Sequence, residues 1–152
     1  MSTPEERLAE LGLSLPDVVP PLAAYVPAAR SGNLIFTAGQ LPARDGAMLA
    51  TGKVGGGVSE EEGYACARQC ALNGLAAIKA EIGDLSAIKR VVKLVVFVAS
   101  DPAFTAQPKV ANGASELLGE VFGDAGRHAR SAVGVSVLPL DVPVEVELVV
   151  EV

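Results

Sequence analysis

The chain has 152 residues, of which 50% are hydrophobic and 4% aromatic, and its formal net charge is −6 at pH 7. This length is that of one domain, predicted over residues 1–152, and the acidic balance without clusters of Lys or Arg argues against binding to nucleic acid. No apolar segment approaches the ~18 residues of a membrane span, and without a secretory signal we expect a cytoplasmic protein.

Residues 3–12 carry the signals of a short surface helix. Thr3 and Glu6 form a T-x-x-E capping box, and Gly12 can end the helix. We therefore predict an additional N-terminal helix within residues 1–14 and assign it no chemistry.

The next segments predict extended chain followed by a long helix. The Pro-rich segment around Tyr25 is expected to hold a short edge strand, and residues 34–39 form a second strand. Ser59 begins the helix, with Glu62 completing another capping box, and Gly83 ends it. An apolar stripe recurs along this helix at helical spacing: Ala67, Ala71, Leu75, Ile78 and Ile82.

The two cysteines, Cys66 and Cys70, lie four residues apart on one face of this helix. Adjacent turns of one helix are a poor arrangement for a disulfide. The chain has only one His to complete a metal site. We interpret both cysteines as reduced packing residues and predict no metal site.

The second half predicts a strand, a helix and two more strands. The apolar run 94–99 is typical of a central strand with both faces buried. The helix after it is interrupted by Gly113 and ends near Gly123. A mixed sheet with two helices on one face is the simplest α+β solution. Its other face would be apolar and uncovered, which, with the large apolar fraction, predicts partner subunits.

The final two strands flank the turn LPLDVP and alternate with a period of two. Arg130, Ala132 and Gly134 share one face of the first strand, and Glu145 and Glu147 lie opposite an apolar face on the second. These charges are either a solvated face or the lining of a pocket. The small neighbours of Arg130 leave room for a guanidinium to clamp a carboxylate. If the strands pair as a hairpin, Glu145 has matching parity and completes a minimal hydrolytic site.

For each of three other features, two interpretations remain open. The glycine run of KVGGGVSEE, residues 53–61, is a flexible loop or an anion site at a helix start. His128 is a histidine at the rim of a pocket or an acid–base group, with no Ser or Cys nucleophile beside it. Asn112, inside a predicted helix, is exposed or contacts a site.

The segments SGNLIFTAGQLP, SEEEGYACARQCALNGLAAIKAEIGDLSAIKRVVKLVVFVASDPAF and ARSAVGVSVLPLDVPVEVELVVEV, in this order, resemble the YjgF/RidA family of reactive-intermediate deaminases, also named endoribonuclease L-PSP. The resemblance runs from about Leu22 to Val152. It implies a chorismate-mutase-like α+β fold. Three copies would form a homotrimer around a central β-barrel, with a site in each cleft between subunits.

The resemblance also implies an activity. Members hydrolyse enamines and imines of the 2-aminoacrylate type to 2-oxo acids and ammonia, without metal or cofactor. Arg130 corresponds to the arginine that pairs with the substrate carboxylate, and Glu145 to the glutamate that positions or activates water. Tyr25 and Asn112 correspond to residues that line the site, and Ala132 to a position whose main chain contacts the ligand.

Two departures mark a divergent branch of that family. Ala132 stands where many members carry a cysteine, and His128 stands where the family has proline in P-A-R. A non-catalytic trimer that binds small carboxylates is therefore the alternative. Ribonuclease activity is the weakest alternative, because the chain is acidic and lacks a His–His or His–Lys pair for phosphoryl transfer.

Overall fold

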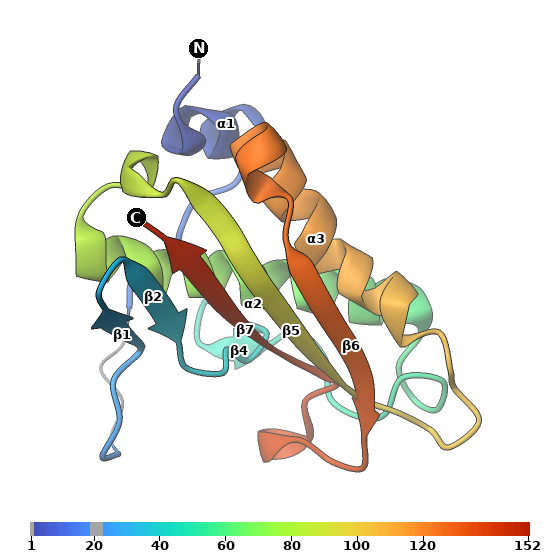
Figure 1. The fold of residues 1–152 in the computed structure, drawn as a ribbon. Coiled ribbons are helices and arrows are strands. Elements are labelled where there is room, and N and C mark those ends of the chain that lie inside the picture. Colours follow the sequence, from blue (N-terminus) through green and yellow to red (C-terminus); the bar gives the residue numbers. More distant parts are fainter. Residues whose placement is uncertain (1, 19–22) are drawn as a thin grey trace.

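The computed structural model of the chain describes residues 2–18 and 23–152, which form a mixed sheet with helices against one face (Figure 1). The five strands lie in the order β1-β2-β7-β5-β6. The strands of this sheet are β1 (Ala28–Ser31), β2 (Leu34–Thr37), β5 (Arg90–Ala99), β6 (Ala129–Val135) and β7 (Val144–Glu151), and a separate pair is formed by β3 (Ala43–Arg44) and β4 (Ala47–Met48).

Three α-helices accompany the sheet, and the two long ones, α2 and α3, pack against one face, as the sequence predicts. The helices are α1 (Pro4–Glu10), α2 (Glu60–Ile82) and α3 (Gln107–Phe122), with short 3-10 turns η1 (Leu85–Ala87), η2 (Gly123–Gly126) and η3 (Pro139–Asp141). The predicted α+β class is thus confirmed. Within the described residues, no helix is long and apolar enough to cross a membrane.

The predicted caps begin the first two helices. The Thr3 hydroxyl accepts from the Glu6 N–H while the Glu6 carboxylate accepts from the Thr3 N–H, a complete capping box. At the start of α2, the Ser59 hydroxyl accepts from the N–H of Glu62. The first helix is more than a surface element, because its Leu8 is buried in the main core and α1 packs against α3.

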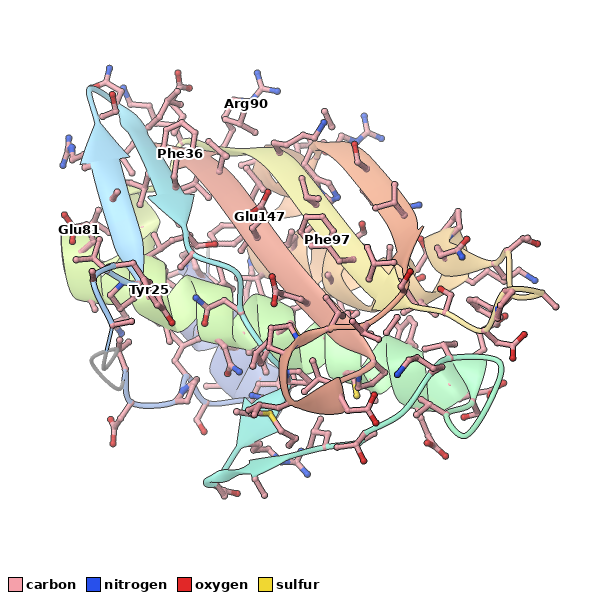
Figure 2. All side chains as sticks on the ribbon, turned by 90° about the horizontal axis from the view of Figure 1, so that it is seen from below. Tyr25, Phe36, Glu81, Arg90, Phe97 and Glu147 are labelled. Carbon is pink, nitrogen blue, oxygen red and sulfur yellow. The ribbon has the colours of Figure 1, made fainter. Side chains whose placement is uncertain are left out.

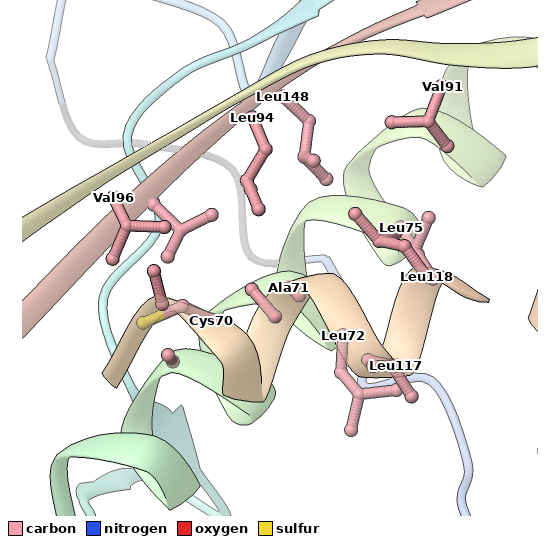
Figure 3. Packing of buried hydrophobic residues seen from close by; sticks show 14 of the residues in the cluster. Cys70, Ala71, Leu72, Leu75, Val91, Leu94, Val96, Leu117, Leu118 and Leu148 are labelled. Carbon is pink, nitrogen blue, oxygen red and sulfur yellow. The ribbon is translucent and has the colours of Figure 1, made fainter. Parts of the chain in front are cut away.

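The hydrophobic core lies between the sheet and the two long helices (Figure 3). Alternate residues of β7 are fully buried against this layer: Val144, Val146, Leu148 and Val150. The apolar stripe of α2 packs against them, and its small members Ala67 and Ala71 let the helix lie close. The alternation predicted for the last strand is confirmed.

The last two strands do not form the hairpin that the sequence suggests, because β5 lies between them. β5 pairs in parallel with β6 and antiparallel with β7. Parallel neighbours need a long crossover, and α3 provides it. Once β6 occupies one edge of β5, β7 can pair only with the other edge, where it satisfies the remaining backbone groups of this central strand.

The face of the sheet turned away from α2 and α3 is covered by no helix of the described residues, but it is not uniformly apolar. Phe36 and Val133 are 43% and 44% exposed there, and Phe97 lies next to Val133 in the register of β5 and β6 (Figure 2). Glu145 and Glu147 of β7 point to the same face, opposite to the buried residues of their strand. We call this surface the open face.

Gly113 does not interrupt the second helix as predicted, since α3 runs without a break from Gln107 to Phe122. A Cβ at Gly113 would lie 2.1 Å from the carbonyl oxygen of Tyr64 in α2. The glycine is therefore a contact point at which the backbones of α2 and α3 approach each other closely. Its cost in helix propensity is offset by this packing.

Gly113→Ala should destabilise the fold by roughly 1–3 kcal/mol, because the two helices must separate to admit one methyl group. Gly119→Ala on the same helix is the matched control, since a Cβ there meets nothing within 4 Å. That change should stabilise the helix by up to about 1 kcal/mol. Urea unfolding of both variants measures the difference, and equal midpoints would contradict the close contact.

Candidate active site

Arg130 lies on the edge strand β6 and points toward α3. Its partner in the register is Leu94, which is buried against the helices, so the two side chains share that face. Its Nη1 donates to Asn112 Oδ1 at 2.8 Å and to Ser115 Oγ at 3.1 Å. The structure thus brings together Arg130 and Asn112, and it resolves the open question about Asn112 in favour of a polar contact.

The positive charge of Arg130 has only neutral acceptors. Although its side chain is half-buried, it forms no ion pair with any carboxylate in the described part of the chain. Both hydrogens of Nη1 are engaged by α3, whereas Nε and Nη2 donate to no group among residues 2–18 and 23–152. The Nε–Nη2 edge is one of the two edges of a guanidinium that can bind a carboxylate with two parallel hydrogen bonds.

His128 lies beside this arginine and contacts a residue that the sequence analysis missed. Its Nε2 is 2.9 Å from Ser115 Oγ, and its Nδ1 is 2.7 Å from the carbonyl oxygen of Gly126. No Ser or Cys was marked out beside His128 from the sequence, and the structure places Ser115 there. Ser115 follows Asn112 by three residues on α3, and this i, i+3 spacing places both on one helix face. From this spacing, the sequence could have indicated that Ser115 lies beside Asn112.

Ala132 and Gly134 share the inner face of β6 with Arg130. Ala132 is half-buried and packs against the core. A Cβ at Gly134 would lie 2.8 Å from Nε2 of Gln107 in α3. The space beside Gly134 is therefore occupied by the side chain of Gln107. The Arg130 guanidinium, which was expected to use this space, instead contacts Asn112 and Ser115.

Glu145 lies on the open face of β7, half-buried beside the backbone of Gly39. A Cβ at Gly39 would lie 2.4 Å from Glu145 Oε2, so a larger residue there would require the Glu145 carboxylate to shift. Burial raises the pKa of the Glu145 carboxyl, and the like charge of Glu147 on the same face raises it further. A carboxyl with a raised pKa in a partly buried position is suited to exchanging protons with a reacting group.

Arg130 and Glu145 do not meet within one chain. Arg130 points toward α3, and Glu145 points to the opposite face of the sheet. In addition, β5 separates their strands by two spacings, roughly 10 Å. The matching parity was conditional on a hairpin, and this condition is not met because β5 lies between β6 and β7.

Tyr25 lies outside any strand, because the edge strand predicted around it begins later, at Ala28. The Tyr25 side chain is 59% exposed. Together with Gly39 and Asn73 it lines a cavity of about 880 Å³ between the segment after α1 and helix α2. Arg130 does not line this cavity, so the structure places Tyr25 near Gly39 but away from the arginine.

The two cysteines do not offer a reactive thiol. Cys66 and Cys70 are free, buried thiols. Burial raises the pKa of Cys66 to about 11 and that of Cys70 well above its usual value, so neither is a reactive thiolate at neutral pH. Within the residues that the structure describes, no three His, Cys, Asp or Glu side chains cluster as metal ligands would.

Comparison with known proteins identifies relatives of this fold. The family model described as "YjgF/chorismate_mutase-like, putative endoribonuclease" matches residues 5–152 and so includes most of α1. The chain is 48% identical over 146 residues to Protein TCP17 of Trypanosoma cruzi, covering 95% of this chain and 91% of that protein.

Two solved structures share the whole architecture. The protein Atu1372 from Agrobacterium tumefaciens, of unknown function, is 47% identical with a TM-score of 0.92, over 99% of this chain and 92% of that one. A "putative endoribonuclease" from Shewanella oneidensis MR-1 is 38% identical with a TM-score of 0.96, over 99% of this chain and 100% of that one. The motifs, the α+β fold and these matches agree, and the chain belongs to the YjgF/chorismate-mutase-like family.

Proposed function

We propose that this protein hydrolyses reactive enamines and imines of small 2-amino acids to 2-oxo acids and ammonia. The observation that carries the proposal is the half-buried Arg130, whose charge has only neutral partners and whose Nε–Nη2 edge has no partner in the described chain. Such an edge fits the α-carboxylate that these substrates share. Family membership supports the same function, since the resemblance of the motifs implies it.

The active form in this proposal is a homotrimer with its sites between subunits. Because Arg130 and Glu145 lie on opposite faces of one sheet, a site that uses both takes them from two neighbouring copies. The open face supports such an assembly, since Phe36 and Val133 leave apolar surface uncovered there. Three such faces would line the central barrel.

The hydrolysis needs one water molecule and no cofactor. Arg130 holds the carboxylate, and the enamine tautomerises to the imine, whose C=N carbon is electrophilic. The Glu145 carboxylate takes a proton from water as the oxygen bonds to that carbon, and the nitrogen becomes protonated. In the resulting carbinolamine the hydroxyl proton passes to the amino nitrogen by way of the Glu145 carboxylate, the C=O bond forms, and the C–N bond breaks to release ammonia.

The other site residues have supporting roles in this scheme. Asn112 holds Nη1 of the arginine. The main chain at Ala132 lies two residues beyond Arg130 and would contact the ligand, while Tyr25 would line the site from the adjoining subunit. His128 lies at the rim, where it contacts Ser115. Because an imine is already reactive, orientation and proton transfer suffice, each contributing roughly 10²-fold or more.

Arg130→Ala should lower kcat/KM for imine hydrolysis roughly 10²-fold or more, because the carboxylate loses a bidentate partner. Arg130→Lys should be intermediate, since it keeps the charge but not the fork. Arg127→Ala, three residues earlier and exposed, is the matched control. The assay generates 2-aminoacrylate with a serine dehydratase and traps the surviving imine with semicarbazide.

Two results would point elsewhere. Wild-type protein that binds pyruvate but never accelerates loss of trapped imine would favour the non-catalytic carboxylate-binding alternative. Cleavage of RNA that depends on Arg130 would favour the activity in the family description. The acidic chain makes the second result unexpected.

A mixed oligomer tests whether the two residues of one site come from two copies. Arg130→Ala and Glu145→Gln should each be inactive alone. Refolded together in equal amounts, they should recover about a quarter of wild-type activity, because one adjacent pair in four then supplies both intact residues. A site within one chain would give no recovery in any mixture.

The pH dependence follows from the raised pKa of Glu145. Its base form is the carboxylate, so kcat/KM should fall as the pH decreases through a value above the ~4.3 of an ordinary glutamate. Glu147→Gln removes the like charge and should move this acid limb to lower pH, while burial keeps it above the ordinary value. Glu151→Gln, farther along the same strand, is the control. An acid limb that Glu147→Gln leaves in place would contradict Glu145 as the base.

A further inference from the structure

A chain of hydrogen bonds leads from Arg130 to a backbone carbonyl and fixes the orientation of every group in it. A carbonyl oxygen only accepts, so the His128 nitrogen that faces Gly126, Nδ1, carries the hydrogen. In the neutral ring Nε2 then has a lone pair and accepts from the Ser115 hydroxyl. That leaves the lone pairs of Ser115 Oγ free to accept from Nη1 of Arg130.

We propose that Ser115 and His128 are positioning residues that set the plane of the Arg130 guanidinium for carboxylate binding. This inference rests on the proposed function of Arg130 as the carboxylate clamp. It assigns a role to two residues that the hydrolysis scheme does not use in its chemical steps. Both are half-buried and belong to separate segments, Ser115 to α3 and His128 to the loop that enters β6.

The geometry of a guanidinium explains why two bonds matter. The two hydrogens of Nη1 lie in the plane of the group, and here one points to Asn112 and the other to Ser115. A single bond would let the plane rotate about its axis, whereas two bonds from one nitrogen fix the plane. The direction of the opposite Nε–Nη2 edge is then also fixed, which reduces the entropy lost when a carboxylate binds.

His128 acts one bond farther away. It holds the Ser115 hydroxyl proton on the side away from Arg130, so the hydroxyl cannot turn that proton toward the guanidinium. Without His128 the hydroxyl can rotate, but its oxygen remains available to Nη1. The loss of His128 should therefore matter less than the loss of Ser115.

The same contacts argue against Ser115 as a nucleophile. A serine paired with a histidine that a carbonyl orients resembles a catalytic dyad. In this structure, however, the oxygen lone pairs that would attack a substrate accept from Arg130. The arrangement is suited to holding the guanidinium and not to acyl transfer.

The test measures pyruvate binding to the full-length protein by NMR titration, together with KM and kcat for imine hydrolysis. Ser115→Ala should weaken pyruvate binding and raise KM about 3- to 10-fold, with kcat changed less than about 2-fold, as expected for one lost hydrogen bond. Ser115→Thr keeps the hydroxyl and should stay near wild type. His128→Leu should weaken pyruvate binding and raise KM about 2- to 4-fold. His128→Gln, which retains an acceptor, should restore most of the lost affinity.

Ser86→Ala, in the exposed turn η1, is the control for the loss of a serine hydroxyl. Urea midpoints of all variants separate positioning from instability, since a merely structural role would lower the midpoint without a selective rise in KM. The NMR signal of Arg130 Nε–H gives a reading without ligand. It should broaden or shift in Ser115→Ala and recover in Ser115→Thr.

Each contrary result has its own meaning. If Arg130→Ala abolishes pyruvate binding while Ser115→Ala and His128→Leu bind like wild type, the positioning role is overturned and the proposed function stands. If Arg130→Ala also binds like wild type, the carboxylate clamp fails and this inference fails with it. Stoichiometric labelling of Ser115 by a fluorophosphonate would make it a nucleophile and overturn the positioning role.

Discussion

The central strand β5 determines how the chemistry of this chain is arranged. Its apolar run is paired on both edges, in parallel with β6 and antiparallel with β7. Because the side-chain period of a strand is two, this register decides the face on which every polar residue of β6 and β7 lies. Arg130 is thereby directed to the helices, and Glu145 to the open face.

The environment of Arg130 differs from that of Lys53 and Arg68, which form ion pairs. Lys53 and Arg68 each contact a carboxylate of their own chain, at 2.5 Å and 3.1 Å. Arg130 instead contacts the oxygens of Asn112 and Ser115, which fix its position without neutralising its charge. A half-buried cation surrounded by neutral acceptors retains most of its attraction for an external anion.

The sequence predicted what local patterns determine and missed what tertiary contacts determine. The cap at Ser59 and the alternation of β7 follow from short-range rules, and both were found. The placement of β5 between β6 and β7 depends on α3 acting as a crossover, which no local pattern contains. Gly113 was interpreted as a helix breaker, because only the neighbouring helix reveals why a glycine is required there. Ser115 was missed because its partner His128 comes from another segment.

The proposed assembly would bring together two charges that each chain leaves incompletely compensated. Burial and Glu147 disfavour the negative form of Glu145, and Arg130 carries a positive charge without a carboxylate partner. An arginine from a neighbouring copy would lower the pKa of Glu145, whereas covering the open face would raise it by further desolvation. The two effects oppose each other. In this proposal the Glu145 carboxylate accepts a proton as a substrate carboxylate neutralises the arginine, which would couple substrate binding to the strength of the base.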